Sequence, residues 1–294
     1  MFKRKKDLSK VVKPGGFKDI WFRLKKNKLA MIGLVLVALV VLLAVFADVL
    51  ADYDTMAIEQ HPEIRLQGPS VEHILGTDAY GRDIFARIAH GARYSLTFAL
   101  VCTVISLIGG TLVGAAAAYA GGAVDNVIMR ILDAFFCMPA MLLTISLSSV
   151  LGMGLKSIII ALSISSIPGY ARIVRSVMLS ISQQEYIEAA RANGFGSFRI
   201  IVGHMVPNAI SILIVNAMMS MAGLIMSAAA LSYIGMGIQA PAPEWGAMLQ
   251  EGQSYMRDHF SMVLIPGLAI VITALGFNLL GDGLSEALDP RMKD

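Results

Sequence analysis

Six long apolar runs divide this sequence into membrane-length segments separated by polar ones. The runs cover residues 29–49, about 95–119, 127–150, about 156–178, 208–236 and 261–281. A helix needs about 20 apolar residues to cross a bilayer, so each run is long enough for one span. We therefore predict an all-α membrane protein with six transmembrane helices. Hydrophobic residues make up 56% and charged residues 15% of the chain, which argues against a soluble enzyme and excludes a disordered chain.

The first apolar run has two readings. A basic start followed by an apolar run is also found in secretory signal peptides, whose apolar part has about 7–15 residues. The run at 29–49 is longer than this, and the basic arm before it is long as well. We therefore favour an uncleaved first span over a signal peptide.

The charges predict which side each loop faces. Residues 1–28 hold 11 of the 24 lysines and arginines, whereas residues 50–94 hold seven acids and only four arginines. Cytoplasmic loops carry the excess of basic residues. The termini and the basic loop 180–207 are therefore expected in the cytoplasm, and 50–94 and 237–260 outside. A basic arm can also bind nucleic acid, but one that adjoins an apolar run is more typical of a membrane flank, so no nucleic-acid partner is expected.

These boundaries define the expected organisation of the chain. A basic cytoplasmic arm (1–28) precedes the first transmembrane helix (29–49) and an extracytoplasmic segment (50–94). A core of five transmembrane helices (95–283) contains the cytoplasmic loop 180–207, and a cytoplasmic tail (284–294) ends the chain. In the second span, small residues recur every four positions at Gly110, Gly114 and Ala118, which predicts close approach of another helix.

The 180–207 loop is predicted to contain two short helices. Ser182 and Glu185 have the spacing of a capping box, which places a helix start near residue 183, and Asn193-Gly194 provides its C-cap.

Ser197 can cap a second helix, which should end or bend near Pro207. On the first helix, one face carries Tyr186, Ala189, Ala190 and Asn193. This small face could seat in the groove of a partner, or the loop could pack on its own bundle.

No enzyme signature survives inspection. Residues 152–157 read GMGLKS, which lacks the second glycine and the strand–loop–helix setting of a phosphate loop. The histidines and the two cysteines show no metal-ligand spacing. We expect no catalytic residue, no metal site and no cofactor in this chain.

The loop resembles the EAA loop of bacterial ABC importer permeases. The matching residues are Glu188-Ala189-Ala190, Gly194 and Pro207, and the departures from the pattern are His204 and Val206.

A second stretch is similar to the C-type permease subunit of dipeptide, oligopeptide and nickel importers. It runs His73-Ile-Leu-Gly-Thr-Asp-Ala-Tyr-Gly-Arg-Asp83, continues through Arg87 and ends at Gly91-Ala-Arg-Tyr-Ser-Leu96, and the tail Ala287-Leu-Asp-Pro-Arg291 also fits. Taken on its own, the stretch can form local ion pairs among Asp78, Arg82 and Asp83. It could shape a vestibule where a binding protein docks, or it could serve as a structural lead-in to the second span, which we favour.

The resemblance implies a type I ABC importer permease fold in the bacterial cytoplasmic (inner) membrane. It implies a heterodimer with a B-type permease, two ATPase subunits that hold the ATP and Mg²⁺, and an extracytoplasmic substrate-binding protein. This chain would then be a permease and not an enzyme. The residues expected to couple it to the ATPase are Tyr186, Glu188, Ala189, Ala190, Arg191 and Gly194.

The substrate path is expected to need polar groups at membrane depth, which are tolerated where they line a cavity. The candidates are Ser163, Ser165, Ser166 and Asn216. Hydrogen bonds between helices are the alternative role for each of them.

Three alternatives remain for the function. The cargo could be nickel or a nickel chelate in place of dipeptides or oligopeptides, with the same mechanism. An ion-coupled secondary transporter would favour ionisable residues at mid-membrane and an inverted repeat, and neither is evident. A non-transporting scaffold would leave the EAA-like loop unexplained.

Overall fold

The computed structural model describes residues 17–152 and 154–288. Within these ranges the chain is helical, and the only β-type pairing is an isolated bridge between Thr77 and Asp83. The helices are α1 (Phe17–Lys26), α2 (Lys28–Val45), α3 (Ala47–Leu50), α4 (Ile84–Ala120), α5 (Gly122–Phe136), α6 (Ala140–Leu151), α7 (Leu155–Ser182), α8 (Glu185–Ala192), α9 (Ser197–Ile200), α10 (Val206–Tyr233), α11 (Trp245–Gly252) and α12 (Ser261–Leu288).

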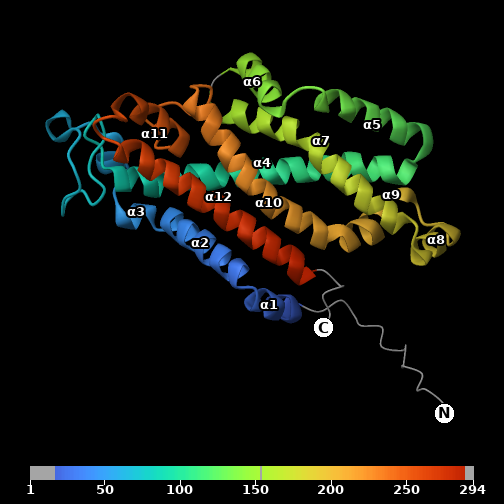
Figure 1. Cartoon of the computed structure of the whole chain (residues 1–294). Coiled ribbons are helices and arrows are strands. Elements are labelled where there is room, and N and C mark those ends of the chain that lie inside the picture. Colours follow the sequence, from blue (N-terminus) through green and yellow to red (C-terminus); the bar gives the residue numbers. More distant parts are fainter. Residues whose placement is uncertain (1–16, 153, 289–294) are drawn as a thin grey trace, which may run out of the picture.

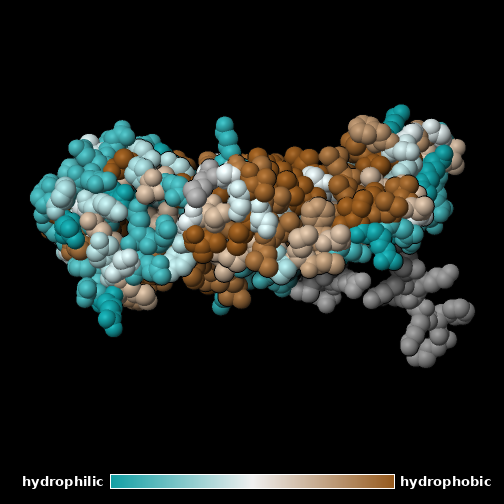
Figure 2. Space-filling model, turned by 90° about the horizontal axis from the view of Figure 1, so that it is seen from above, coloured by the Kyte–Doolittle hydropathy of each residue, from teal (hydrophilic) through white to brown (hydrophobic). Residues whose placement is uncertain are grey.

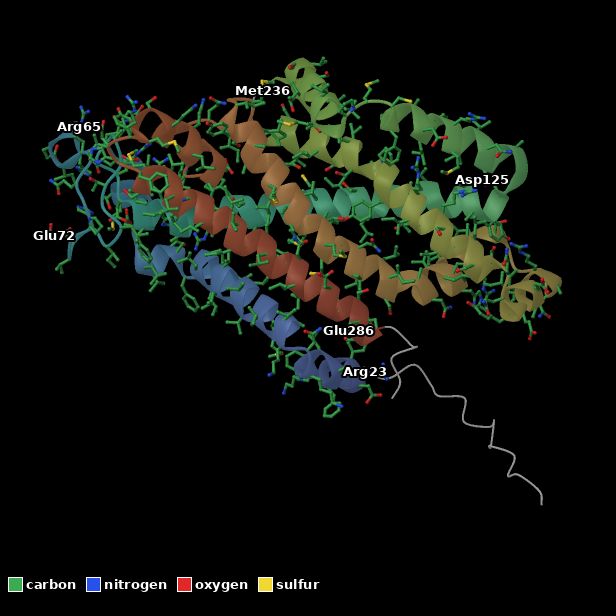
Figure 3. The ribbon with its side chains drawn as sticks, in the orientation of Figure 1. Arg23, Arg65, Glu72, Asp125, Met236 and Glu286 are labelled. Carbon is green, nitrogen blue, oxygen red and sulfur yellow. The ribbon has the colours of Figure 1, made fainter. Side chains whose placement is uncertain are left out.

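The long helices form an elongated bundle with polar ends. The loops between α3 and α4 lie at one end, and α8 lies at the other (Figure 1). Apolar residues form a broad belt between hydrophilic ends (Figure 2). Arg65 and Glu72 mark the first end, whereas Arg23 and Glu286 lie toward the second (Figure 3). This arrangement confirms a helical membrane fold, while the side that faces the cytoplasm still rests on the charge pattern.

Five helical stretches are long and apolar enough to cross a membrane. They are α2, α4, α7, the stretch from α9 through α10, and α12. Five of the six expected spans are therefore confirmed as long apolar helices.

The sixth expected span, at 127–150, is not a straight helix. It consists of α5 and α6, which are bent by 87° with respect to each other. The helix stops before Pro139, which becomes the N-cap of α6, because proline disfavours helical geometry in the residue before it. The chain has six spans if α5 and α6 together cross the membrane as one broken span, and five if they do not.

Several expected boundaries are shifted. Helix α4 begins at Ile84, inside the segment 50–94, because Asp83 caps its N-terminus and accepts a hydrogen bond from the Ala86 N–H at 2.7 Å. At the other end of the chain, α12 extends through residue 288 into the expected tail. Residues 1–16 of the basic arm and 289–294 of the tail lie outside the described residues.

The predicted small-residue stripe packs as expected. Gly110, Gly114 and Ala118 are all buried on α4, and α4 and α7 form the most extensive helix pair in the bundle. A Cβ atom at Gly110 would stand 2.9 Å from the backbone nitrogen of Ala171, and one at Gly114 would stand 2.9 Å from the Cβ of Val174. The two backbones therefore approach too closely for any larger residue.

We expect Gly110→Ala to destabilise the folded protein. The added methyl group meets backbone atoms of α7 that have no free space to move into, and such overpacking costs about 1–3 kcal/mol. A lowered thermal unfolding midpoint in detergent would show this. The matched control is Gly223→Ala on α10, where a Cβ meets nothing within 4 Å, so its midpoint should stay unchanged or rise. Equal midpoints for the two variants would contradict the packing argument.

The end that carries the 53–83 loops contains a buried group of charges. Arg82 donates through Nε to Asp78 at 2.7 Å, so the expected local ion pair is confirmed. The second partner of Arg82 is Glu251 on α11, at 2.7 Å, and Arg87 of α4 reaches the same carboxylate at 2.9 Å. The two arginines are 1% and 0% exposed. The charges balance, and they tie the lead-in to α4 to the helix that precedes the last span.

Candidate functional site

Helix α8, in the loop 180–207, starts at Glu185, and Gln184 is its N-cap. The capping box expected between Ser182 and Glu185 is absent. Helix α7 continues through Ser182, whose hydroxyl donates to the carbonyl of Leu179 at 2.8 Å. The Ser182 side chain is therefore used to close α7, and α8 begins without a side-chain cap.

The end of α8 follows the prediction. The Gly194 N–H donates to the carbonyl of Arg191 at 2.9 Å, and the Phe195 N–H donates to the carbonyl of Ala190 at 3.1 Å. These are the two bonds of a Schellman motif, with Gly194 at the left-handed position and φ of 78°. The left-handed backbone conformation is what favours glycine at this position. Space is not the reason, since a Cβ at Gly194 would meet nothing within 4 Å.

The side chains of α8 divide between the bundle and the outside. Ile187 and Ala190 are buried in a cluster that includes Val174 and Met178 of α7. Five of the six expected coupling residues are exposed, namely Tyr186, Glu188, Ala189, Arg191 and Gly194, whereas the sixth, Ala190, is buried against the bundle. The sequence left two alternatives for this loop, packing on its own bundle or seating in the groove of a partner. One side of α8 packs on the bundle, and the other side is exposed.

The second part of the loop differs from the expectation. Gly196, and not Ser197, is the N-cap of α9. The helix does not end at Pro207, because the chain continues through a π-helical turn (Ile201–Met205) into α10, where the proline lies in the first turn. Proline is tolerated there, since the first turn has N–H groups without helical partners in any case.

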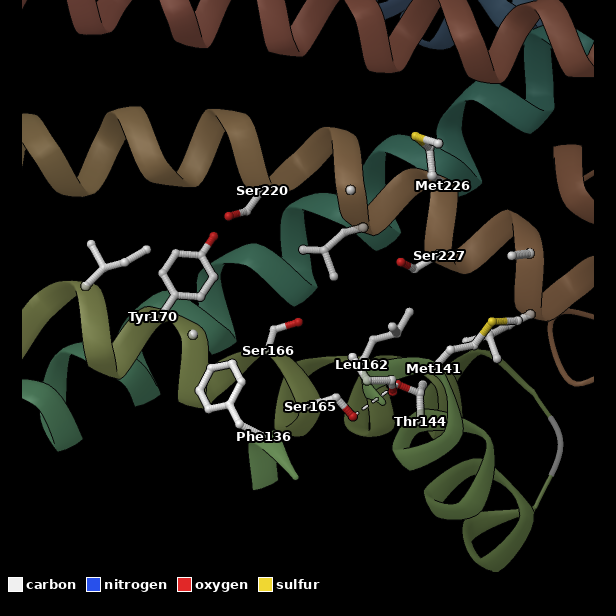
Figure 4. Close-up of a pocket in the computed structure, with 17 residues that line it drawn as sticks. Phe136, Met141, Thr144, Leu162, Ser165, Ser166, Tyr170, Ser220, Met226 and Ser227 are labelled. Carbon is white, nitrogen blue, oxygen red and sulfur yellow. Dashed lines mark hydrogen bonds between the residues drawn. The ribbon is translucent and has the colours of Figure 1, made fainter. Parts of the chain in front are cut away.

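A groove of about 550 Å³ lies between α6, α7 and α10 (Figure 4). Helix α7 runs through Pro168 without a break and brings Ser165 and Ser166, two of the four candidate path residues, to the groove. The Thr144 hydroxyl of α6 donates to the Ser165 hydroxyl at 3.0 Å.

Two of the expected path residues lie elsewhere. Ser163 is 1% exposed and does not line the groove, and its backbone carbonyl accepts a hydrogen bond from the Ser106 hydroxyl at 3.2 Å. This contact joins α4 and α7 through the Ser163 backbone, and the Ser163 hydroxyl finds no hydrogen-bond partner among the described residues. Asn216 is not among the lining residues either, and its side-chain amide donates to the carbonyl of Ile212 in its own helix. It lies one helical turn before Ser220, toward the end that carries α8.

The groove adds four polar residues that the sequence did not single out, namely Thr144, Tyr170, Ser220 and Ser227. The last two are seven residues apart on α10 and thus share a face of that helix. The spacing could have predicted a polar face on α10. Only the tertiary structure shows that this face lies opposite α7. None of the groove-lining residues is charged.

Two ion pairs join α5 to α7 near the α8 end. Arg175 donates to Asp125 through two nitrogens at 2.5 Å each, and Arg172 donates to Asp133 at 2.8 Å. Asp133 therefore has its ionic partner on the neighbouring helix α7. These contacts brace the bent pair against the helix that leads into α8.

Taken together, the bundle, the uncharged groove and the exposed loop helix describe a polytopic membrane transport component. Comparisons with known proteins give its family. The family described as "Binding-protein-dependent transport system inner membrane component" matches residues 110–294. A second description, "N-terminal TM domain of oligopeptide transport permease C", matches residues 16–69.

Curated relatives match along almost the whole chain. A dipeptide transport system permease protein of Alkalihalophilus pseudofirmus is 43% identical over 277 residues, which is 94% of this chain and 90% of the relative. A di/tripeptide transport system permease protein of Pseudomonas aeruginosa is 38% identical over 97% of this chain and 95% of its own length. A glutathione transport system permease protein of Escherichia coli is 42% identical over 94% and 90%.

A solved structure supports the fold. An inward-facing form of the MetNI methionine ABC transporter aligns with 69% of this chain and 96% of its own chain, with a TM-score of 0.56 and 21% identity. The chain belongs to the family of binding-protein-dependent transport system inner membrane components. It is a permease component of the inner membrane, and the family is not the ATPase of such systems.

Proposed function

We propose that this chain forms, together with a B-type permease, the translocation path of an ATP-driven peptide importer. An extracytoplasmic binding protein would deliver the peptide, and two ATPase subunits, which hold ATP and Mg²⁺, would drive the cycle. The observation that carries this proposal is the connection between α8 and the groove. Helix α8 has an exposed side for a partner, and it follows α7, whose Ser165 and Ser166 line the groove.

The proposed coupling is a rigid-body transfer. Ile187 and Ala190 hold α8 against α7 in a buried cluster, so a displacement of α8 by the ATPase would also move α7. Tyr186, Glu188, Ala189 and Arg191 would form the contact, and the Gly194 turn would fix the angle at which the chain leaves it. ATP binding on the neighbouring subunit would then bias the groove between two states.

The chemistry of the groove supports peptide as cargo. Serine, threonine and tyrosine hydroxyls can both donate and accept hydrogen bonds, which suits the N–H and C=O groups of a peptide backbone. The lining has no histidine, cysteine or carboxylate, the side chains that bind nickel most readily. Relatives whose names refer to dipeptides, di- and tripeptides and glutathione point the same way. Nickel or a nickel chelate is the second candidate, and inhibition of labelled-dipeptide uptake by unlabelled peptide, but by neither nickel nor a nickel chelate, would decide against it.

We expect Ser227→Phe to block transport by filling the groove. Ser227 lines the groove opposite α7 (Figure 4), and a phenyl ring there takes the place of the cargo. Uptake of labelled dipeptide should fall about tenfold or more, which corresponds to about 1.4 kcal/mol. Ser163→Ala is the control, because Ser163 lies outside the groove, and it should leave uptake unchanged. If Ser227→Phe reaches the membrane and transports normally, the groove is not the path.

A further inference from the structure

Helix α1 is amphipathic and lies at one boundary of the membrane. Its Leu24 packs with Ala30 of α2 and Ala287 of α12, and Gly283 of α12 allows this close approach. The exposed part of the α1 surface carries the aromatic rings of Trp21 and Phe22, which are 38% and 62% exposed. The helix is thus held to the bundle by Leu24, and residues 17–152 and 154–288 leave its two aromatic rings exposed.

Lysines lie next to these exposed rings. The Lys25 ammonium is 5.1 Å from the centre of the Trp21 ring, and the Lys26 ammonium is 4.6 Å from that of Phe22. Lys28 follows at the start of α2 and is exposed as well. Every ion pair found among the described residues lies elsewhere, so these three lysines have no carboxylate partner there. The exposed surface of α1, which we call its outer side, therefore combines aromatic rings with positive charge that no described carboxylate pairs.

The position of α1 next to the first span, α2, indicates how deep α1 lies in the membrane. Asn27 is the N-cap of α2, and its side chain accepts a hydrogen bond from the Ala30 N–H at 3.0 Å, so α1 and α2 are separate helices (Figure 1). Helix α2 is long and apolar enough to span, and its exposed Leu29, Ile32 and Val35 continue the apolar surface from α1 into the membrane. Helix α1 is thus placed at the headgroup level of the end that carries α8.

We propose that the outer side of α1 is a binding site for anionic lipid headgroups. Trp21 and Phe22 would enter the interfacial layer, where aromatic side chains are favoured, while Lys25, Lys26 and Lys28 would pair with lipid phosphates. The site anchors α1, and through it the ends of α2 and α12, to the membrane surface.

The test uses Trp21 as a built-in reporter. The full chain is reconstituted in vesicles that contain equal amounts of phosphatidylcholine and phosphatidylglycerol, with bromine carried by the acyl chains of one lipid or of the other. The chain has two tryptophans, and Trp245 is buried. A Trp21→Phe protein measures the Trp245 signal, which is subtracted.

We expect Trp21 to be quenched about fivefold more strongly by brominated phosphatidylglycerol than by brominated phosphatidylcholine, the ratio that corresponds to one lysine near an anionic surface. The triple change Lys25→Gln, Lys26→Gln, Lys28→Gln should bring the ratio close to one. The matched control removes three exposed charges elsewhere (Arg65→Gln, Lys156→Gln and Arg257→Gln) and should keep the original ratio. Equal quenching by both lipids in the unaltered chain would overturn the proposal. Absence of quenching by either lipid would overturn it as well, because α1 would then be covered by protein.

Discussion

Glu188→Lys should abolish transport while the protein still folds and inserts. Glu188 is exposed on α8 and makes no contact that holds the bundle together. Reversing its charge replaces attraction with repulsion at the proposed ATPase contact, and a misplaced charge at an interface costs several kcal/mol. Peptide uptake and substrate-stimulated ATP hydrolysis should therefore fall about a hundredfold, which corresponds to about 2.7 kcal/mol.

The control for this prediction is Asp282→Lys. Asp282 is an exposed carboxylate on α12 near the same end of the bundle, but not on α8. Its reversal makes the same change in net charge and should leave transport near normal. Co-purification of the ATPase subunits with each variant distinguishes two causes. If the ATPase subunits no longer co-purify, docking is lost, and if they still do, the coupling of ATP hydrolysis to transport is lost. Normal uptake by the Glu188→Lys protein would remove α8 from the coupling mechanism.

Glu251→Leu should cause the largest loss of stability. The change leaves Arg82 and Arg87, which are almost fully buried, with Asp78 as their one remaining acidic partner. Removing one partner from a buried ion pair costs about 3–5 kcal/mol, because a charge is left without compensation. The thermal midpoint of the purified protein should fall sharply. Glu72→Leu, which removes an exposed carboxylate from the same end of the bundle, should leave the midpoint unchanged.

A second change should rescue part of this loss. Arg87→Met in the Glu251→Leu protein restores the charge balance, with the Asp78–Arg82 pair intact. The double variant should therefore be more stable than Glu251→Leu alone, and the coupling between the two changes should be measurable in a double-mutant cycle. A double variant less stable than both single variants would show that the charges act independently.

The sequence could predict most of the spans, because apolar runs of membrane length leave few alternatives. It placed the start of α4 too late, since a hydropathy pattern ends a span at the first charges. Three charged or polar residues of α4 before position 95 have their partners in distant parts of the chain. Arg87 binds Glu251, His90 lies 2.9 Å from the carbonyl of Ala51, and Arg93 binds Asp48 at 2.8 Å. Such long-range partners leave no mark on the local pattern.

The coupling loop was predicted in part, because its signals are local. The Gly194 turn follows from the sequence, since few residues other than glycine adopt its backbone conformation. The start of α8 was misplaced, because Ser182 had a competing partner in α7. The groove was predicted least well. Ser165 and Ser166 line it and Ser163 does not, and this difference depends on the rotation of α7 against α4 and α10, which hydropathy does not encode.

The central claim is that this chain is needed for ATP-driven peptide uptake. The most direct measurement follows labelled dipeptide in cells that lack the gene, with or without the restored chain, while the ion gradient is collapsed and ATP is maintained. We predict that uptake is lost on deletion, returns with the unaltered chain, and survives collapse of the gradient. Uptake that persists without the gene, or that stops with the gradient while ATP is present, would contradict the account.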